Sequence, residues 1–504
     1  MFETPRIRVE WRASLDLVGS VLVYLAVPLV FPLTLAVYYG EPLLPFLVAI
    51  AVTLALGGGM NLLGDEELNL GPREAFLAVA LIWFLVAAVG AIPFVVAGNG
   101  TIASPVNAMF EAMSGLTTTG ATVFQDFSVH SNSILMWRQL IQWLGGLGIL
   151  ILATAVLSSL GVGGAQLMES ETQTRDLNKL TPKISETARL IWGLYVGITA
   201  LAIAVYYSLG LSGLAPNMTL YNAVAHAFTS VATAGFSPEP GSAGAFAPIA
   251  QWAIIPFMII GSTNFILIYF FIHGEPMRLL RNEEFHFYLG TLAFFSAVVA
   301  VMLAIDPGIG FTSEETIRHA LFNISSIITT TGYASADYTA WSAAAQHMIF
   351  LGMFLGGMVG STTCSIKSLR WLVALKSLRR SLYTSIHPDA IRPVRLSGSP
   401  IDEETIRDIY AYLLLSLIIF FMLTIFIVVD AARFQAVEVS EFDAMGAAAS
   451  TFLNIGPAFG EAGPFGTYDI FPTSTKVVMI VLMWIGRIEI IPVLVLFTKA
   501  FWTS

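Results

Sequence analysis

Four short segments rich in threonine, serine and glycine hold the residues best suited to chemistry in this sequence. They read FEAMSGLTTTGAT at 110–122, AFTSVATAGFS at 227–237, LFNISSIITTTGYAS at 321–335 and STFLNIGPAFG at 450–460. Glycine permits backbone angles that turn carbonyl oxygens inward. A ring of inward carbonyl oxygens can replace the water around a dehydrated cation. The segments therefore predict a site that binds a metal cation through the backbone.

The candidate ligands are the carbonyl oxygens of one glycine in each segment and of the two residues before it. They are Thr118, Thr119, Gly120, Thr233, Ala234, Gly235, Thr330, Thr331, Gly332, Asn454, Ile455 and Gly456. A single Thr-Thr-Thr-Gly string is more typical of a loop with hydroxyl caps. Four aligned copies instead predict a pseudo-fourfold ring made by one chain. His226 and His319 lie in or near these segments, and we interpret both as packing residues because no carboxylate or cysteine recurs around them.

A second candidate group lies in GGMVGSTTCSIK at 356–367, inside a long apolar stretch. Glycine weakens a helix, and serine and threonine side chains can bond their own backbone in non-helical form. We expect a broken helix with a loop beneath the ring, although a helix contact made of small residues is an alternative. The candidate gate residues are Gly356, Gly357, Gly360, Ser361, Thr362, Thr363, Lys367 and Arg487. Cys364 is expected to be a small buried residue rather than a reactive thiol.

Arg487 interrupts the apolar stretch at 477–498. A guanidinium near the centre of a bilayer costs several kcal/mol unless it faces water or a partner. Glu489 is two positions away, so on a helix it points to another side. We therefore expect Arg487 to face the path below the ring; a structural salt bridge to a distant acidic residue is the alternative. Lys367 either adds a second positive charge at the inner mouth or extends its amine to the membrane surface.

The composition shows what must position these residues. Only 12% of the 504 residues are charged and 56% are hydrophobic, against about 25% charged residues in globular proteins. A soluble protein is thereby excluded, and the single cysteine excludes an internal disulfide. A crossing helix needs roughly 20 apolar residues. Ten intervals meet that length: 17–40, 42–64, 75–110, 139–168, 190–238, 240–274, 285–305, 338–366, 409–429 and 477–498.

Basic residues set the expected orientation, because Lys and Arg are retained on the cytoplasmic side. A cytoplasmic N-terminus leaves only Arg138, Arg318, Arg433 and Lys476 in or beside outer loops. The outer loops are otherwise acidic, which would either concentrate cations at an outer vestibule or simply keep the surface soluble. The short helices before the four loops should enter from the outer face. Their C-terminal ends, which carry partial negative charge, would then point at the central cavity.

Three further motifs accompany the loops: QWLGGLG at 142–148, LTPKISETA at 180–188 and GRIEI at 486–490. With these motifs the sequence resembles the TrkH/TrkG branch of the superfamily of potassium transporters that includes the KtrB and HKT proteins. The resemblance implies an all-α integral membrane protein with two N-terminal helices and four helix–pore loop–helix units around one pore. We expect an N-terminal segment at 1–66, units at 67–160 and 161–276, a third unit with an intramembrane gating loop at 277–398, and a fourth at 399–504.

The same resemblance implies potassium uptake across the cell membrane, with K⁺ bound by the filter residues given above and no organic cofactor. It also implies a homodimer, a loop at 356–367 that obstructs the pore, and an electrostatic barrier at Arg487. Gly120 favours potassium, because sodium-preferring relatives can carry serine there. Four residues depart from the glycine that is common in the family: Thr363, Cys364, Ser365 and Ala458. They put in doubt the mobility of the gating loop and the shape of the fourth loop.

A cytosolic nucleotide-binding regulator, TrkA-like, is the partner that the resemblance implies, and no nucleic acid is expected. This chain itself has no GxGxxG or P-loop string. The basic residues from Lys367 to Arg395 and the segment 169–183 could contact such a regulator, or could reflect only the positive-inside rule. An alternating-access carrier coupled to Na⁺ or H⁺ is the alternative function. An intramembrane enzyme is the weakest, because the chain has no HExxH and its lone cysteine has no adjacent histidine.

Overall fold

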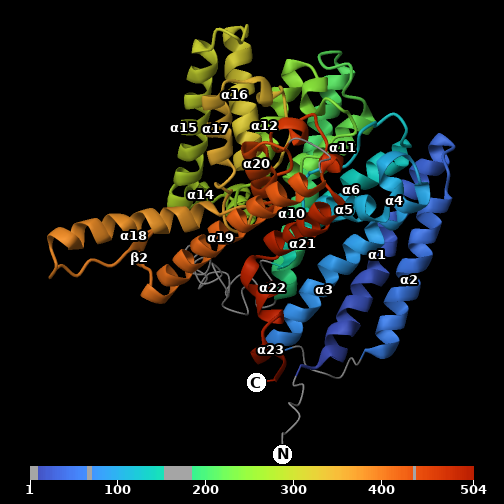
Figure 1. The fold of residues 1–504 in the computed structure, drawn as a ribbon, viewed down its shortest axis with the longest axis horizontal. Coiled ribbons are helices and arrows are strands. Elements are labelled where there is room, and N and C mark those ends of the chain that lie inside the picture. The colour runs from blue at the N-terminus through green and yellow to red at the C-terminus, as the bar shows by residue number, and fades with distance from the viewer. Residues whose placement is uncertain (1–8, 65–70, 153–183, 435–438, 504) are drawn as a thin grey trace, which may run out of the picture.

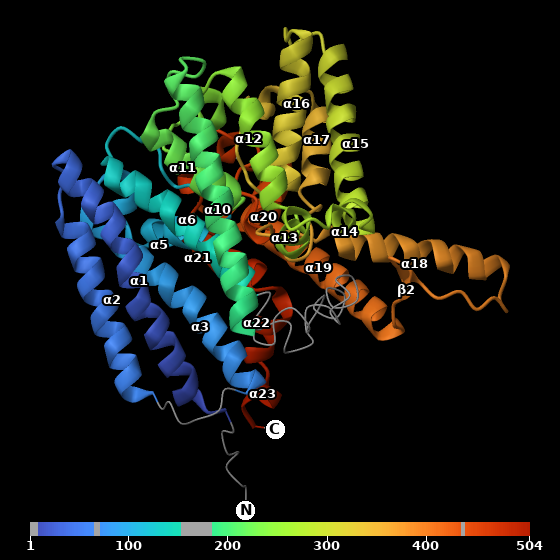
Figure 2. The ribbon, with the colours of Figure 1, turned by 180° about the vertical axis from the view of Figure 1, so that it is seen from behind.

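The computed structural model describes residues 9–64, 71–152, 184–434 and 439–503 (Figures 1 and 2). Within these ranges the chain is mostly helical, with one short hairpin of the two-residue strands β1 (Arg395–Leu396) and β2 (Ser399–Pro400). The first four residues of the LTPKISETA motif and the whole segment 169–183 lie outside the described residues. The ends of the expected N-terminal segment and of the first unit fall outside them as well.

An antiparallel pair of helices begins the fold, and four similar groups of helices follow it. The pair is α1 (Trp11–Tyr39) and α2 (Leu44–Leu63). The first group has α3 (Pro72–Gly90), α4 (Ile92–Ala97), α5 (Pro105–Leu116) and α6 (Asn132–Leu152). The second has α10 (Ile184–Leu211), α11 (Leu220–Val231), α12 (Pro248–Gly261) and α13 (Phe265–Ile272).

The third and fourth groups repeat this order with additions. The third has α14 (Pro276–Leu280), α15 (Glu283–Ile305), α16 (Ser313–Ile328), α17 (Ala343–Gly352) and α18 (Ser368–Ile386). The fourth has α19 (Glu403–Phe434), α20 (Glu441–Phe452), α21 (Thr473–Arg487), α22 (Ile490–Leu496) and α23 (Lys499–Thr503). In both views α18 extends away from the rest of the molecule (Figures 1 and 2). The all-α fold with a helix pair and four repeated groups confirms the expected class.

The short helices α5, α11, α16 and α20 are the ones that precede the four loops. Three of them begin at a hydroxyl cap: Thr219, Thr312 and Ser440 each accept a hydrogen bond from a backbone N–H in the first turn. Such a cap contributes about 1 kcal/mol. The fourth, α5, begins at Pro105, whose fixed φ suits the first helical position. Each helix ends where the threonine- or asparagine-containing loop begins, so local sequence fixes both ends.

Fewer helices are continuous than the ten apolar intervals suggest. Among the described residues, seven helices are long and apolar enough to cross a membrane. The interval 240–274 forms a bent pair, α12 and α13, that turns by 105°. The interval 338–366 contains only α17 before a non-helical stretch, and 477–498 is broken between α21 and α22 at Ile488 and Glu489. Of these three breaks the sequence predicts only the second, through its glycines.

The basic residues assigned to the outer side lie within helices rather than in loops. Arg138 in α6 is 1% exposed, Arg318 in α16 is 4% exposed and Lys476 in α21 is 6% exposed. Each is paired with a carboxylate, which the charge count could not show. The partners are Glu111 at 2.7 Å, Glu314 at 2.8 Å and Asp469 at 2.9 Å, respectively. The negative charges of these three carboxylates are therefore balanced by the basic residues with which they pair.

Candidate functional site

The four aligned glycines share one backbone conformation. Their φ angles are 83° at Gly120, 78° at Gly235, 85° at Gly332 and 114° at Gly456. Two positions earlier, Thr118, Thr233, Thr330 and Asn454 also have positive φ, between 49° and 55°. Positive φ is rare for a β-branched residue, so the surroundings must hold the three threonines in place. Four unlike sequences therefore adopt the same strained turn, which is the structural signature of equivalent positions.

The four loops pack on one another in a closed cycle. A Cβ placed on any of these glycines would lie less than 3.0 Å from the carbonyl oxygen that precedes the aligned glycine of another loop. The pairs are Gly120 with Ala234, Gly235 with Thr331, Gly332 with Ile455, and Gly456 with Thr119. Only glycine permits this approach. The candidate ligand residues of all four segments thus meet in one ring.

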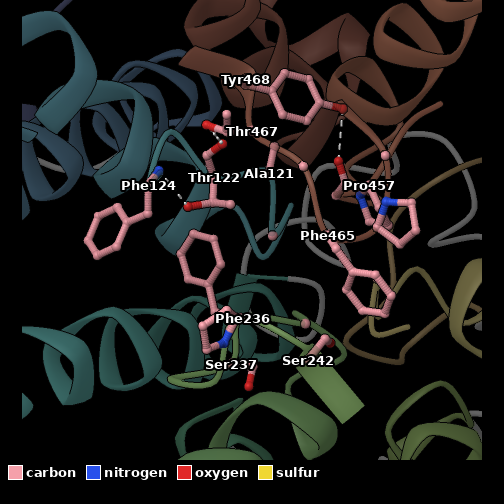
Figure 3. Close-up of a pocket in the computed structure, with 18 of the residues that line it drawn as sticks. Ala121, Thr122, Phe124, Phe236, Ser237, Ser242, Pro457, Phe465, Thr467 and Tyr468 are labelled. Carbon is pink, nitrogen blue, oxygen red and sulfur yellow. Dashed lines mark hydrogen bonds between the residues drawn. The ribbon is translucent and has the colours of Figure 1, made fainter. Parts of the chain in front are cut away.

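All four glycines also line one cavity of about 440 Å³. Its wall is formed by residues that follow the glycines, including Phe124, Phe236 and Phe465 (Figure 3). Tyr468 closes one side, and its hydroxyl donates to Gly456 O at 2.9 Å. The carboxyl-bearing residues Glu239 and Glu461 also line the cavity. The ring therefore forms the floor of a cavity that can receive a cation.

One further carboxylate lies on the segment between α5 and α6. The Ser128 side chain and backbone N–H donate to Asp126 Oδ1 at 2.7 and 2.9 Å. These hydrogen bonds lower the pKa of the Asp126 carboxyl below its usual value. Asp126 therefore stays ionised at neutral pH and adds negative charge near the cavity-lining residues Gln125 and Phe127.

Residues 353–367, between α17 and α18, contact the loops on the side opposite the cavity. The Thr362 hydroxyl donates to Gly261 O at 2.8 Å and lies 2.9 Å from the Thr233 hydroxyl. Cys364 N donates to Thr330 Oγ1 at 3.0 Å, and Ser365 N donates to Leu453 O at 3.1 Å. Thr233, Thr330 and Leu453 lie just before the aligned glycines in the chain, whereas the cavity wall follows these glycines. The ring therefore lies between the cavity and this stretch.

The other candidate gate residues shape the same stretch. Gly356 N donates to Ile366 O at 2.8 Å, and Gly357 lies so close to Ser262 that a Cβ would clash. Gly360 has a φ of 77°. Ser361 Oγ and Thr363 Oγ1 are 2.8 Å apart, and Lys367 Nζ donates to Thr363 Oγ1 at 3.0 Å. The glycines and hydroxyls thus support a compact non-helical fold, as their residue types predict.

Arg487, at the end of α21, is 2% exposed and points at this stretch. One guanidinium nitrogen donates to Thr362 O at 2.9 Å and lies 2.7 Å from Cys364 Sγ. The other terminal nitrogen donates to Gly145 O at 3.1 Å. Glu489 pairs instead with Arg370. Among the described residues, Arg487 has no carboxylate within salt-bridge distance. Its guanidinium therefore donates hydrogen bonds to two backbone carbonyls and to one thiol.

Comparison with known proteins shows which family the chain belongs to. The family model of TrkH, described as a cation transport protein, matches residues 45–503. The chain belongs to the TrkH family. It is 32% identical to the Trk system potassium uptake protein TrkH of Halomonas elongata, over 97% of this chain and 99% of that one. It is 30% identical to TrkH of Escherichia coli K12, over 98% and 99% respectively.

A solved structure of the TrkH family has the same fold. The crystal structure of the potassium transporter TrkH from Vibrio parahaemolyticus matches with a TM-score of 0.86 and 28% identity. The match covers 98% of this chain and 100% of that one. Together with the seven apolar helices, the family shows a multi-pass membrane protein.

The QWLGGLG motif of this TrkH-family chain has a direct structural role. Gln142 Nε2 donates to Ala234 O at 2.5 Å, and its Oε1 accepts from Phe236 N at 3.0 Å. Gly145 lies against Leu116 O, and Gly146 against Tyr195 and Ala232, with no room for a Cβ. The motif thus lets α6 approach the first short helix closely while one amide holds the second loop.

A buried ion pair behind the first loop was missed by the reasoning from sequence. Glu111 in α5 and Arg138 in α6 are 0% and 1% exposed. Glu111 Oε2 accepts from Val123 N at 2.9 Å, and Arg138 Nη1 donates to Ser237 O at 3.1 Å. The pair therefore joins the segments that follow the first and second glycines. One signal was available: Glu111 is the single charged residue in the sequence of α5.

Polar side chains at equivalent positions perform the same task in the second and third loops. His226 Nε2 lies 3.1 Å from Ser237 Oγ. Asn323 Oδ1 accepts from Ser335 N at 3.3 Å. His319 Nδ1 lies 2.8 Å from Ser335 Oγ. Both histidines are buried among hydrogen-bond partners and aromatic rings, which agrees with their interpretation as packing residues. In the described residues no group of three or more His, Cys, Asp or Glu side chains could hold a metal.

Proposed function

We propose that this chain is the potassium-conducting subunit of a Trk uptake system, and that K⁺ permeates through a selective ring of backbone carbonyls. One observation carries the proposal: the four aligned glycines pack in a closed cycle and line one cavity. The ligands would be the carbonyl oxygens of the residue triplets that end at Gly120, Gly235, Gly332 and Gly456. The names of the curated relatives support potassium as the cation, and Gly120 agrees with it.

We further propose that residues 356–367 and Arg487 form the gate. Hydrogen bonds tie the stretch to the second, third and fourth loops through Thr233, Thr330 and Leu453. Arg487 places a positive charge within hydrogen-bond distance of Thr362 O. A cation leaving the ring would meet both. Opening then requires the stretch to move and the guanidinium to turn away.

The assembly and the domain organisation remain part of the proposal. The units would divide as the sequence predicts, at about residues 66, 160, 276 and 398, in a homodimer with a cytoplasmic N-terminus. A TrkA-like nucleotide-binding protein would bind the cytoplasmic side. The helix α18 supports such contact, since it extends from the molecule and carries basic residues (Figure 1). Of these, Lys376 and Arg380 already pair with Glu283 and Glu403, so Arg379 is the clearest candidate.

Gly332→Ser tests the ring directly. A side chain at Gly332 would meet Ile455 O and would have to adopt a φ of 85°, so the adjacent carbonyls must shift. We expect the preference for K⁺ over Na⁺ to fall about 10-fold, which corresponds to about 1.4 kcal/mol. The measurement is voltage-driven K⁺ and Na⁺ flux in proteoliposomes of the purified chain. Gly197→Ser is the matched control, because nothing lies within 4 Å of a Cβ at Gly197.

Two outcomes would contradict the ring. Unchanged selectivity in Gly332→Ser would show that the loops do not discriminate between cations. Saturable uptake that requires a Na⁺ or H⁺ gradient would favour the alternating-access carrier, to which the bent pair α12 and α13 would then belong.

Thr362→Val tests the loop. Valine keeps the shape of the side chain but removes the hydroxyl that contacts Gly261 O and Thr233 Oγ1. Loss of a buried hydrogen bond costs about 1 kcal/mol, and we expect K⁺ flux through the resting protein to rise about 5-fold. Thr424→Val is the control, since among the residues that the structure describes the Thr424 hydroxyl donates only to Phe420 O of its own helix. If Thr362→Val and the native protein show equal K⁺ flux at rest, Thr362 does not contribute to the gate.

A further inference from the structure

A second cavity, of about 800 Å³, lies between α15 and α19. Its side walls are formed by Gly290 and Phe294 on α15 and by Leu417 and Phe421 on α19. Its floor is formed by the end of α17, by both ends of the stretch 353–367 and by Trp371 at the start of α18. The volume is within the roughly 300–1,000 Å³ range of small-ligand sites. We call it the α15–α19 groove.

The chemistry of the groove excludes a polar ligand. Its lining is almost entirely aliphatic and aromatic. The two lining side chains with a hydrogen-bond donor already use it: Thr291 Oγ1 donates to Phe287 O at 2.8 Å, and Trp371 Nε1 donates to Phe354 O at 2.9 Å. A ligand with hydrogen-bonding groups would leave them unsatisfied, at a cost of about 1–3 kcal/mol each. The ligand must therefore be a hydrocarbon.

The position of the groove indicates which hydrocarbon. Both wall helices, α15 and α19, are among those able to cross a membrane. Phe294 is 60% exposed and Phe421 is 54% exposed, so the groove opens toward the surface that these helices present to the bilayer. Its floor reaches Ile366, which is 1% exposed, behind the outer helices. A flexible acyl chain can enter such a depth, whereas a helix of about 10 Å diameter from a second copy cannot.

The floor connects the groove to the proposed gate. Phe354 and Leu355 begin the stretch 353–367, and Ile366 lies at its end. Gly356 N donates to Ile366 O at 2.8 Å and so holds the two ends together. A ligand lying on these residues would contact both ends at once. Any movement of the stretch must displace that ligand or rearrange around it.

We propose that one acyl chain of a membrane phospholipid occupies the α15–α19 groove and holds the ends of the stretch 353–367 in the closed arrangement. The proposal that an acyl chain binds here depends only on the shape and lining of the groove. The proposal that this chain affects gating depends on the proposed function.

Quenching of Trp371 fluorescence by phospholipids with brominated acyl chains tests occupancy. The full-length protein is reconstituted in brominated or ordinary phosphatidylcholine, and the emission of Trp371→Phe is subtracted to isolate Trp371. We expect more than half of the Trp371 emission to be lost in brominated lipid. Gly290→Leu should reduce this loss, because a Cβ at Gly290 meets nothing within 4 Å and the added side chain would narrow the groove. Gly197→Leu, on α10, is the matched control.

Three results would overturn the site. Trp371 emission that is equal in the two lipids would show that no acyl chain reaches the floor. Undiminished quenching of Trp371 in Gly290→Leu would show that the brominated chain reaches Trp371 from outside the α15–α19 groove. Trp371 emission that becomes sensitive to brominated lipid only after dilution to monomers would show that a second copy covers the groove. Because quenching requires no transport, it remains informative even if the protein conducts no K⁺. In the flux assay, Gly290→Leu should remove any dependence of K⁺ flux on acyl-chain length.

Discussion

We expect Arg487→Gln to raise K⁺ flux through the resting protein on the order of 100-fold. A unit positive charge roughly 5 Å from a passing cation opposes it by about 3 kcal/mol at an effective dielectric constant of about 20. A barrier of that height slows cation passage about 100-fold. Glutamine removes the charge and also weakens the link from α21 to Thr362 O and Cys364 Sγ. Both effects act in the same direction.

The measurement is single-channel or proteoliposome K⁺ flux without any regulator. Arg487→Lys separates charge from hydrogen bonding, because lysine keeps the charge but not the forked geometry that reaches both Thr362 and Gly145. We expect Arg487→Lys to remain much closer to the native flux than Arg487→Gln. Arg433→Gln, at the exposed end of α19, is the control for loss of one positive charge. Equal flux in native protein and Arg487→Gln would refute the electrostatic barrier.

The second large effect is expected at the buried pair Glu111 and Arg138. Removing one partner leaves the other charge buried and unpaired, which typically lowers the free energy of unfolding by about 3–5 kcal/mol. We therefore expect Arg138→Met and Glu111→Leu each to lower the unfolding temperature strongly. The double variant, which buries no charge, should be markedly more stable than the sum of the two single changes predicts.

Thermal unfolding of the purified chain in detergent measures how much the ion pair contributes to stability. The K⁺/Na⁺ flux ratio measures the effect of the pair on the ring. Selectivity should fall in both single variants, because Glu111 accepts from Val123 N and Arg138 donates to Ser237 O. The exposed pair Glu404 and Arg407 is the control, where removal of one partner should cost under about 1 kcal/mol. Strictly additive losses in the double variant would show that the two side chains act independently.

Much of this architecture can be predicted from sequence because the decisive residues are local. Glycine recurs at 120, 235, 332 and 456, each time after a short apolar segment with threonine or asparagine two positions before it. The need to satisfy backbone groups inside a membrane leaves few structures for such a segment. The break after α17 could be predicted for a similar reason, since Gly356, Gly357 and Gly360 weaken any helix there.

The features that could not be predicted depend on partners far away in the chain. The charge count assigned Arg138 to the outer side but could not reveal its buried partner Glu111, one helix earlier. The break at Glu489 has no glycine or proline at the turn itself; Glu489 adopts a φ of 68° while its carboxylate pairs with Arg370. The 105° bend at Ser262–Asn264 likewise depends on contacts with residues 358–362. In each case tertiary contacts outweigh local preference.

The cycle of glycine and carbonyl contacts has a consequence for how the protein is made. Gly456 rests on Thr119, so the first loop acquires its last neighbour only when the fourth has been synthesised. Domains generally form in order as the chain leaves the ribosome, yet here the earliest loop must wait for nearly the entire polypeptide. A chain released early would hold up to three loops and an open gap in the membrane. We expect such a fragment to be a substrate for proteolysis rather than a partial conductor.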